Sequence, residues 1–382
     1  MNLPETQPAP AGTFPASSQD RMYGLDLCRT VAVLMVVCGH MLQHSQPNSW
    51  LASMGFVGLF GVDLFFCLSG FLIGKILLKE SSRWPIERQA GLYRFWYRRW
   101  MRTLPLYLFF FLISLRYDWT GSSELWSRAS YLVFAQNFLW PMPAFFGLTW
   151  SLAVEEWFYF SFPLLMMLAL ALGRSPKQAM AVAVTVFILL PPFVRFALTA
   201  GPHGFGSLDE GVRHVTLFRL DSIGYGIFMA CLAQWHPAVF TRIGRLYWVF
   251  CGLVLACMIS TKLDHFGWAA SNTWRAVYFS ISGLGFAGLI PFFHGLRSPG
   301  SKVVRSFVRY TSLVSYSMYL AHIFAFMLAM ALLHKSGLYG LFYPNPWLVY
   351  PLFLVAVYAL STLTYLGIEK PALAWRDRKP PH

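Results

Sequence analysis

Ten stretches of the sequence are apolar enough to cross a membrane as helices. A span needs about 20 mostly apolar residues, and the candidates lie near residues 25–44, 56–78, 103–117, 147–172, 178–199, 217–235, 246–261, 274–295, 311–333 and 347–368. The chain is 57% hydrophobic and only 12% charged, whereas a soluble domain carries about 25% charged residues. The sequence therefore predicts an all-α integral membrane protein, with about ten transmembrane helices in a single bundle.

The distribution of Lys and Arg predicts how this bundle is oriented. Ten spans place both termini on one side of the membrane. If that side is the cytoplasm, 21 Lys and Arg residues lie in inner segments and 7 in outer segments, and inner loops are the ones that collect positive charge. We therefore expect cytoplasmic termini, and we ascribe the net charge of +14 to topology rather than to nucleic-acid binding.

The ends of the chain and its cysteines carry weaker signals. Residues 1–20 are rich in Pro, Ala, Ser and Thr and predict a disordered cytoplasmic tail. Residues 21–371 predict one membrane domain, and residues 372–382 a short basic cytoplasmic tail. The apolar run after Arg21 lacks a small-residue cleavage site and is expected to be a retained span. The six cysteines lie in apolar stretches without metal-ligand spacing, so we expect neither disulfides nor a metal site.

The first span carries polar side chains at both ends of an otherwise apolar helix. Arg29 and His40 are eleven residues apart, which is close to a whole number of turns. Both side chains should therefore point the same way, about 16 Å apart along the axis. Asp26 precedes Arg29 by one turn and can pair with it. From spacing alone, two interpretations are equally good: an interfacial ion pair with a snorkelling His40, or a functional stripe of a cation and a titratable imidazole.

The second span contains a carboxylate, Asp63. A charge at the centre of a membrane costs on the order of 2.5–3.5 kcal/mol on insertion scales. Gly58, Gly61, Gly70 and Gly74 allow close contact between helices. The favoured interpretation is a packing face, with Asp63 near the outer interface.

Segment 83–102 is rich in arginines that alternate with aromatic residues. Arg94, Arg98 and Arg102 are four residues apart and should share one face of a helix. One interpretation is an interfacial helix whose arginines meet anionic lipid headgroups. The other is a cytoplasmic phosphate-binding surface, because guanidinium groups bind phosphates in a bidentate manner. The sequence leaves both open, and they are compatible with each other.

The fourth span begins with a polar stripe. Ser151, Glu155 and Tyr159 recur every four residues on one helix face, and Glu156 follows Glu155 directly. Glutamates at the start of a span need partners or water. We therefore weigh a structural ion pair against a functional role for at least one of the two. The preceding outer loop, near residues 118–146, is a candidate cover for a substrate mouth.

Three later spans contain further polar residues. Arg219 and Asp221 are two positions apart, hence not on one helix face, and each is expected to pair elsewhere. His322 lies in the ninth span on roughly the same side as Tyr319, and a structural hydrogen-bonding role is the favoured interpretation for such a single histidine. Glu369 ends the last span at the inner interface.

Taken together, these stretches resemble the acyltransferase-3 family, membrane O-acyltransferases that modify glycans and related hydroxyl compounds. The resemblance rests on an ordered set of motifs across residues 23–371. They are Leu25-Asp-Leu-Cys-Arg29 with His40, Gly61-Val-Asp-Leu-Phe-Phe66 with Leu68-Ser-Gly-Phe-Leu-Ile73, Tyr97-Arg-Arg-Trp-Met-Arg-Thr-Leu-Pro105, Trp150-Ser-Leu-Ala-Val-Glu-Glu-Trp-Phe-Tyr159, Arg219-Leu-Asp-Ser222, Ser315-Tyr-Ser-Met-Tyr-Leu-Ala-His322 and Glu369-Lys-Pro371. Trp157 departs from the pattern, since the family often has Gln there.

The resemblance implies ten transmembrane helices with cytoplasmic termini in a bacterial inner membrane. It implies an acyl-CoA donor, with acetyl-CoA the default, used from the cytoplasmic side without a metal. Arg98, Arg99 and Arg102, with Arg94 beside them, suit the phosphates of CoA. The implied acceptor is a hydroxyl of a glycan or glycoside, including lipid-linked ones. Candidate substrate-binding residues are Asp63, Ser151, Glu156, Tyr159, Arg219, Asp221 and His322.

Our hypothesis for the chemistry assigns His40 as the general base on the acceptor hydroxyl, a role that typically contributes ~10²–10⁴-fold. Glu155 would orient His40 or the acceptor. Arg29, paired with Asp26, would position the donor or stabilise developing negative charge. An acyl-histidine intermediate is the alternative to direct transfer.

Two other classes of protein are compatible with ten spans and buried charges. A transporter or flippase usually carries an internal repeat, and we detect none in this sequence. A membrane scaffold or sensor would leave the titratable stripe and the arginine cluster without a purpose.

Overall fold

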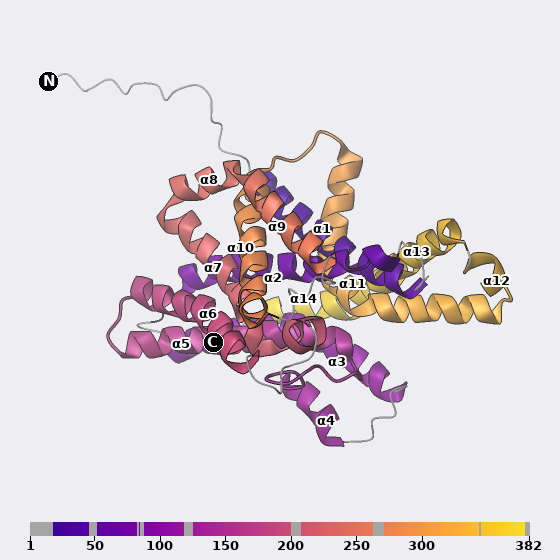
Figure 1. The fold of residues 1–382 in the computed structure, drawn as a ribbon, viewed down its shortest axis with the longest axis horizontal. Coiled ribbons are helices and arrows are strands. Elements are labelled where there is room, and N and C mark those ends of the chain that lie inside the picture. Colours follow the sequence, from indigo (N-terminus) through magenta and orange to yellow (C-terminus); the bar gives the residue numbers. More distant parts are fainter. Residues whose placement is uncertain are drawn as a thin grey trace.

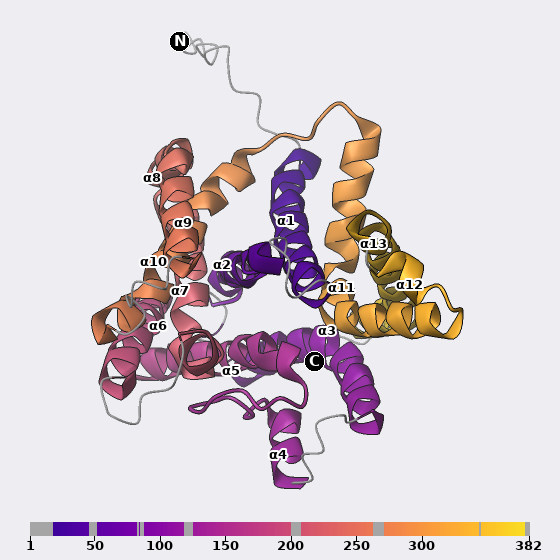
Figure 2. The same cartoon turned by 45° about the vertical axis from the view of Figure 1, so that its right-hand side comes forward.

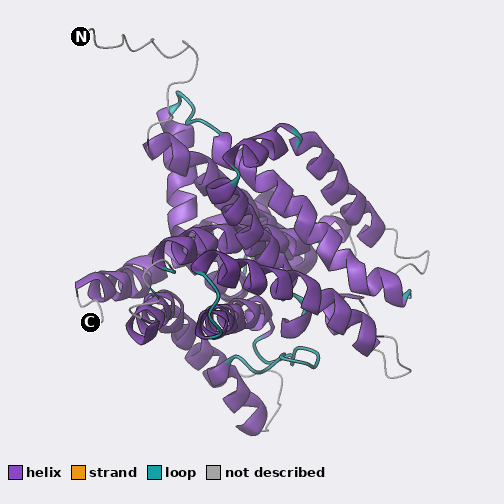
Figure 3. Ribbon diagram, turned by 90° about the vertical axis from the view of Figure 1, so that its left-hand side faces the viewer, coloured by secondary structure: helices purple, strands orange, loops and turns teal. Residues whose placement is uncertain are grey.

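A computed structural model of the chain describes residues 18–45, 52–81, 84, 88–117, 125–199, 208–262, 271–343 and 345–378. These parts are helices joined by loops, with no strand among them (Figure 3). The helices are α1 (Ser18–Ser45), α2 (Val57–Glu80), α3 (Arg88–Arg116), α4 (Leu125–Ser130), α5 (Trp150–Ala171), α6 (Pro176–Thr199), α7 (Leu220–Trp235), α8 (Pro237–Arg245), α9 (Tyr247–Lys262), α10 (Asn272–Gly295), α11 (Lys302–Lys335), α12 (Tyr339–Phe342), α13 (Pro346–Thr364) and α14 (Lys370–Arg378). A π-helical turn, η8 (Tyr365–Glu369), joins α13 to α14.

The described helices agree closely with the predicted spans. Eight of them, within the part of the chain that the structure covers, are long and apolar enough to cross a membrane. The pair α8 and α9, bent by 62°, makes a ninth candidate. The remaining predicted span, near 103–117, falls in the second half of α3, whose first half holds the arginines. The prediction of an all-α, multi-pass membrane protein is confirmed.

The centre of the molecule is formed by α1 and α2 (Figures 1 and 2). In Figure 2, α6 to α10 lie on one side of this pair, α11 to α13 on the other, and α3 to α5 across the bottom. The glycines of α2 make this arrangement possible. A Cβ at Gly61 would lie 2.6 Å from the Ala32 carbonyl oxygen of α1, and a Cβ at Gly70 would overlap the Ile223 carbonyl of α7.

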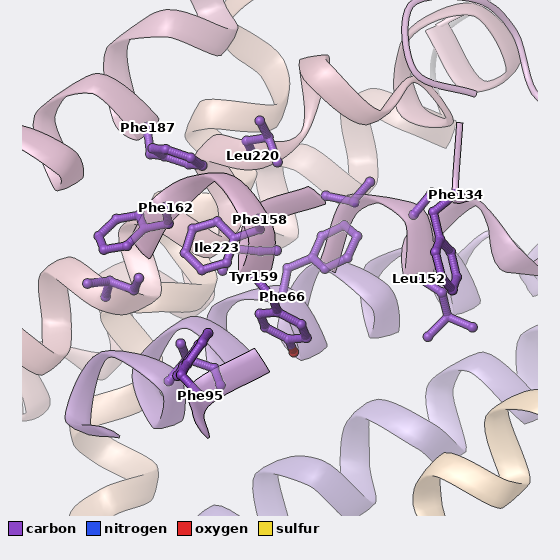
Figure 4. Close-up of a cluster of buried hydrophobic side chains, with 14 of the residues drawn as sticks. Phe66, Phe95, Phe134, Leu152, Phe158, Tyr159, Phe162, Phe187, Leu220 and Ile223 are labelled. Atoms are coloured by element: carbon purple, nitrogen blue, oxygen red, sulfur yellow. The ribbon is translucent and has the colours of Figure 1, made fainter. Parts of the chain in front are cut away.

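Helix α5 contributes to a large cluster of buried hydrophobic side chains. Its residues Phe158 and Phe162 pack against Phe187 of α6, each with ring centroids 5.1 Å apart (Figure 4). Phe66 of α2 meets Trp150 at the start of α5, with centroids 5.8 Å apart. These contacts fix the rotation of α5 about its axis, and so the direction of its polar stripe.

The segment between α4 and α5 is tied into the bundle by a buried amide. Asn137 Nδ2 donates to the backbone oxygens of Trp150 (3.2 Å) and His214 (2.6 Å), and its own backbone oxygen accepts from Thr216 N (2.8 Å). Trp157 Nε1 donates to the Phe134 oxygen (2.9 Å). Part of the predicted loop 118–146 is therefore fixed beside α5 and the start of α7. Its residues 118–124, residues 1–17 of the predicted N-terminal tail and residues 379–382 of the predicted C-terminal tail lie outside the described residues, whereas residues 372–378 belong to α14.

Candidate active site

One cavity of about 800 Å³ lies between α1, α2, α3, α5, α7, α10 and α11. This volume lies in the upper part of the range for ligand-binding pockets, which typically measure about 300–1,000 Å³. Much of its wall is apolar and comes from α2. Most of its polar groups come from four helices: Arg29 of α1, Arg99 and Arg102 of α3, Ser151, Glu155 and Tyr159 of α5, and Ser315, Tyr316 and Tyr319 of α11.

The polar stripe of α5 lines this cavity as a unit. Glu155 accepts hydrogen bonds from Ser69 Oγ through Oε1 and from Tyr159 OH through Oε2, both at 2.9 Å. The neighbouring Glu156 does not line the cavity and accepts from Thr103 Oγ1 at 2.8 Å. Of the two adjacent glutamates, Glu155 is thus the one in contact with the cavity.

Arg29 and Asp26 form the ion pair that their spacing predicts. Arg29 Nη1 is 3.7 Å from Asp26 Oδ1, and Ser312 Oγ of α11 donates to Asp26 at 2.7 Å. Arg29 Nη1 also donates to Ser312 Oγ at 3.1 Å. Because Asp26 and Ser312 hold it from one side, the guanidinium of Arg29 stays in the cavity wall.

The arginines of α3 divide into two groups. Arg99 and Arg102 line the cavity, whereas Arg94 and Arg98 do not. Arg98 is half-exposed and lies 3.9 Å from Asp377 of α14. Arg94, Arg98 and Arg102 lie in one helix, as their spacing predicted, but only Arg102 of the three lines the cavity, and α14 packs against α3 where it meets Arg98. Burial, followed by the charge of Arg102, lowers the pKa of Arg99 to about 10, so this residue is a cation at neutral pH.

His40 lies beyond the cavity, beside a second histidine. Its ring centroid is 5.0 Å from that of His322 on α11, and the His322 ring is 6.2 Å from that of Tyr319, which lines the cavity. His40 Nδ1 is 3.0 Å from the Val36 carbonyl oxygen. Since a carbonyl only accepts, this contact selects the tautomer with the proton on Nδ1 and the lone pair on Nε2.

Tyr319 connects the cavity to this histidine pair. Its hydroxyl donates to the Leu148 carbonyl at 2.7 Å and lies 2.6 Å from Ser151 Oγ. Having one proton to give, Tyr319 accepts from Ser151 in this arrangement. The backbone oxygens of Met318 (3.1 Å) and Tyr319 (2.8 Å) surround Nδ1 of His322.

Comparison with known proteins decides the family. The acyltransferase-3 family, described as an acyltransferase domain, matches residues 22–366. The chain belongs to the acyltransferase-3 family. The site therefore lies within an acyltransferase domain that carries several candidate membrane spans.

Curated relatives of this acyltransferase-3 protein are O-acetyltransferases. The chain is 34% identical over 160 residues to the peptidoglycan O-acetyltransferase OatA of Listeria monocytogenes, and 32% identical over 162 residues to the O-acetyltransferase OatA of Staphylococcus aureus strain NCTC 8325. Each match covers 37% of this chain and 24% of the relative. The match thus spans about a quarter of the length of these relatives. No solved structure matches the chain.

Three predicted substrate-binding residues of the acyltransferase lie in buried ion pairs outside the cavity wall. Asp63 pairs with Arg219 and accepts from Ser282 Oγ at 2.7 Å. Asp221 pairs with Arg195 of α6, with 2.7 Å between Oδ2 and Nη2. The expectation that Arg219 and Asp221 pair elsewhere is confirmed. Their part in substrate binding stays a prediction.

Several cavity residues were absent from the sequence-based prediction. Ser69 belongs to the Leu68-Ser-Gly motif, and this could have singled it out as a partner for a glutamate. Lys75, a cation inside an apolar run, was a second available signal. Tyr316, whose hydroxyl donates to the Thr103 carbonyl at 2.7 Å, and His294 of α10 reach the cavity only through helix packing.

The arrangement suits a long, anionic, partly apolar ligand. Cations from α1 and α3 line the wall near Glu155, and apolar residues of α2 line much of the remainder. Among the described residues, no group of three or more His, Cys, Asp or Glu side chains could hold a metal ion.

Proposed function

We propose that this acyltransferase-3 protein transfers an acyl group, by default acetyl, from acyl-CoA to a hydroxyl of a glycan or glycoside. The family supplies the reaction class. The name of the Listeria relative, a peptidoglycan O-acetyltransferase, supports a carbohydrate acceptor. The predicted cytoplasmic orientation places the arginine-bearing start of α3 on the side where acyl-CoA is available.

One observation carries the proposal: Arg29 and the Arg99–Arg102 pair come from different helices and line the same cavity. Guanidinium groups are well suited to the phosphates of CoA. The apolar wall suits its extended pantetheine arm, and Tyr319, which lines the cavity with its partner Ser151, lies next to His322 of the histidine pair.

The proposed reaction joins a donor in the cavity to an acceptor that reaches His40 from the outer side. Nε2 of His40 takes the proton of the acceptor hydroxyl, whose oxygen attacks the thioester carbonyl carbon. The new C–O bond forms and the C–S bond breaks. The CoA thiolate leaves while His40 holds the proton, which then passes to the thiolate. Acyl ester and free CoA are the products.

The geometry refines the roles of the other two polar residues. Arg29 is eleven residues from His40, about 16 Å along α1, which favours positioning of the donor over stabilising charge at the reacting carbon. The hydrogen bonds of Glu155 go to Ser69 and Tyr159. This favours contact with substrate over orientation of His40.

Hydrolysis of acetyl-CoA by the purified protein in detergent tests the proposal. We expect slow CoA release without an acceptor, reduced by ~10²–10⁴-fold in His40→Ala because the general base is lost. His334→Ala, at the exposed end of α11, is the control and should match wild type. Full activity in His40→Ala would reject the base. If the protein neither binds acetyl-CoA nor releases CoA from it, the proposed donor is rejected and a transporter is favoured.

Radiolabelled acetyl-CoA separates the two chemical routes. Direct transfer predicts no label on protein that is denatured rapidly at neutral pH, where an acyl-imidazole survives longer than in acid. An acyl-histidine intermediate predicts label that His40→Ala lacks and that a glycan acceptor removes.

A further inference from the structure

The cavity wall holds a second group of polar side chains, which the reaction proposed above does not use. Lys75 of α2, Gln234 of α7 and His294 of α10 all line the cavity. Each lies within the last two turns of its helix, and the predicted topology places these three helix ends on the cytoplasmic side. Because Lys75 and Gln234 are exposed and His294 is half-buried, we place the mouth of the cavity here.

Close helix packing brings these ends together. A Cβ at Gly74 would lie 2.7 Å from the Cβ of Ala230, so α2 and α7 are in contact one residue before Lys75. A Cβ at Gly24 would overlap the Phe293 carbonyl, which fixes the end of α10 against the start of α1. The positions of the mouth residues are therefore set by backbone contacts.

One buried ring supports both Lys75 and His294. Lys75 Nζ lies 5.4 Å from the ring centroid of Phe71, and the His294 ring makes a T-shaped contact with the same ring, with centroids 5.8 Å apart. Phe71 is fully buried and stacks on Phe240 of α8. The cation and the imidazole thus contact one fixed aromatic support, which restricts them before a ligand arrives and lowers the entropy cost of binding.

The charge of the cavity wall favours an anionic ligand. Among the described residues that line it, Arg29, Lys75, Arg99 and Arg102 carry positive charges, and Glu155 is the one carboxylate. The carboxyl ends of α7 and α10 add partial negative charge at the mouth. Binding of an anion at the mouth therefore depends strongly on Lys75.

An acyl-CoA has phosphates that suit two separate cationic groups. Its thioester and its adenosine 3′-phosphate lie at opposite ends of the molecule, with the pyrophosphate between them. With the thioester toward Tyr319 and the pyrophosphate at the arginines, the 3′-phosphate lies toward the mouth. Lys75 follows Ser69, the partner of Glu155, by six residues, or about 9 Å along α2. A phosphate monoester carries ~1.5–2 negative charges at pH 7, more than either phosphate of the pyrophosphate.

We propose that Lys75, with His294 and Gln234, forms a phosphate-binding site at the cavity mouth, which binds the 3′-phosphate of the donor's adenosine and selects CoA over acyl donors that lack this group. This inference rests on the proposed function. Lys75 supplies the charge, and the imidazole and the amide donate hydrogen bonds to phosphate oxygens. Because the mouth is remote from the reacting carbon, the site acts on donor affinity rather than on the chemical step.

Comparison of acetyl-CoA with 3′-dephospho-acetyl-CoA in the detergent assay tests this site. Wild type should show a KM about tenfold higher for the dephospho donor, because it loses a hydrogen bond to a charged group. Lys75→Gln should raise the KM for acetyl-CoA by about the same factor, leave kcat little changed and use the two donors equally well. Lys75→Arg keeps the charge and should keep the preference of wild type.

Lys79→Gln is the matched control, since Lys79 is exposed one turn later on α2 and does not line the cavity. It should keep the preference for acetyl-CoA. The absence of a preference in wild type, or an unchanged preference in Lys75→Gln, would overturn the site. Equal losses in Lys75→Gln and Lys79→Gln would also overturn it, in favour of a diffuse electrostatic field.

Adenosine 3′-monophosphate separates this site from the choice of donor. If acetyl-CoA is neither bound nor consumed by wild type, the proposed function fails. Adenosine 3′-monophosphate should still raise the unfolding temperatures of wild type and Lys79→Gln above those measured with adenosine, but not that of Lys75→Gln. Equal effects of the two compounds on wild type, or an equal shift in Lys75→Gln, would overturn the site at the mouth.

Discussion

Two adjacent arginines of α3 have different surroundings. Arg99 lines the cavity, whereas Arg98 faces Asp377 of α14 and is half-exposed. Helical spacing alone groups Arg98 with Arg94 and Arg102. Which side of α3 borders the cavity depends on α14, and the sequence gives no direct sign that α14 packs there.

Substitution of these arginines should therefore give unequal results. Arg99→Gln or Arg102→Gln should raise the KM for acetyl-CoA about 10–100-fold, since a hydrogen bond to a charged group contributes ~1.5–3 kcal/mol and 1.4 kcal/mol is tenfold. Arg98→Gln should leave KM unchanged. Steady-state kinetics of the three variants is the measurement, and an equal effect at all three positions would argue for a diffuse electrostatic field.

Local pairing could be predicted at the residue scale, but distant pairing could not. The one-turn spacing of Asp26 and Arg29 was sufficient to predict their contact. The geometry of Arg219 and Asp221 excluded a mutual pair, yet it did not identify Asp63, 156 residues before Arg219. That partner is determined by how α2 packs on α7.

The buried pair of Asp221 and Arg195 should be far more sensitive than an exposed one. Asp221→Leu leaves Arg195 charged and uncompensated, which typically costs ~3–5 kcal/mol. The double variant Asp221→Leu with Arg195→Met should recover much of that loss. Thermal unfolding in detergent measures both, and a double variant less stable than the single one would contradict this account.

At the scale of elements, α2 and α7 cross with their backbones in contact. A Cβ at Gly226 would overlap the Cys67 carbonyl and lie 2.9 Å from the Cα of Gly70. The glycine pattern of α2 predicted close packing, and this could be seen from sequence. The identity of the neighbouring helices could not, because the same small residues are compatible with several partners.

Alanine substitutions should show which glycines are required. Gly70→Ala and Gly226→Ala should each destabilise the protein by ~1–3 kcal/mol or more through overpacking. Gly252→Ala in α9, where a Cβ would meet nothing within 4 Å, should be neutral or slightly stabilising. Unfolding temperatures in one detergent provide the comparison, and similar shifts at all three sites would point to a general effect of helix propensity.

For the whole molecule, hydrophobicity and charge were sufficient to predict the class and the approximate bounds of most spans, although the described residues contain eight or nine candidate spans where ten were predicted. These two properties could not reveal the cavity, because it is formed by seven helices from all parts of the chain. The positions of Tyr316 and His294 in its wall follow from packing alone. The orientation in the membrane remains a prediction from the distribution of Lys and Arg.

A topology reporter tests that orientation. Fused after His382, a fluorescent protein that matures only in the cytoplasm should give a signal, whereas an alkaline phosphatase that needs the periplasm should be inactive there. The reverse result would place the arginines of α3 on the outer side and remove access to cytoplasmic acyl-CoA.

The π-helical turn at Tyr365–Glu369 also restricts insertions and deletions in this segment of the chain. Such a turn contains about one residue more than an α-helical turn, and each residue of a helix contributes a rotation of about 100°. Loss of one residue here would turn α14, or the helix before it, by that angle and direct Glu369 away from Ser317, whose Oγ donates to Glu369 Oε2 at 2.7 Å. Natural variants of this segment should therefore accept many exchanges of side chain but very few insertions or deletions.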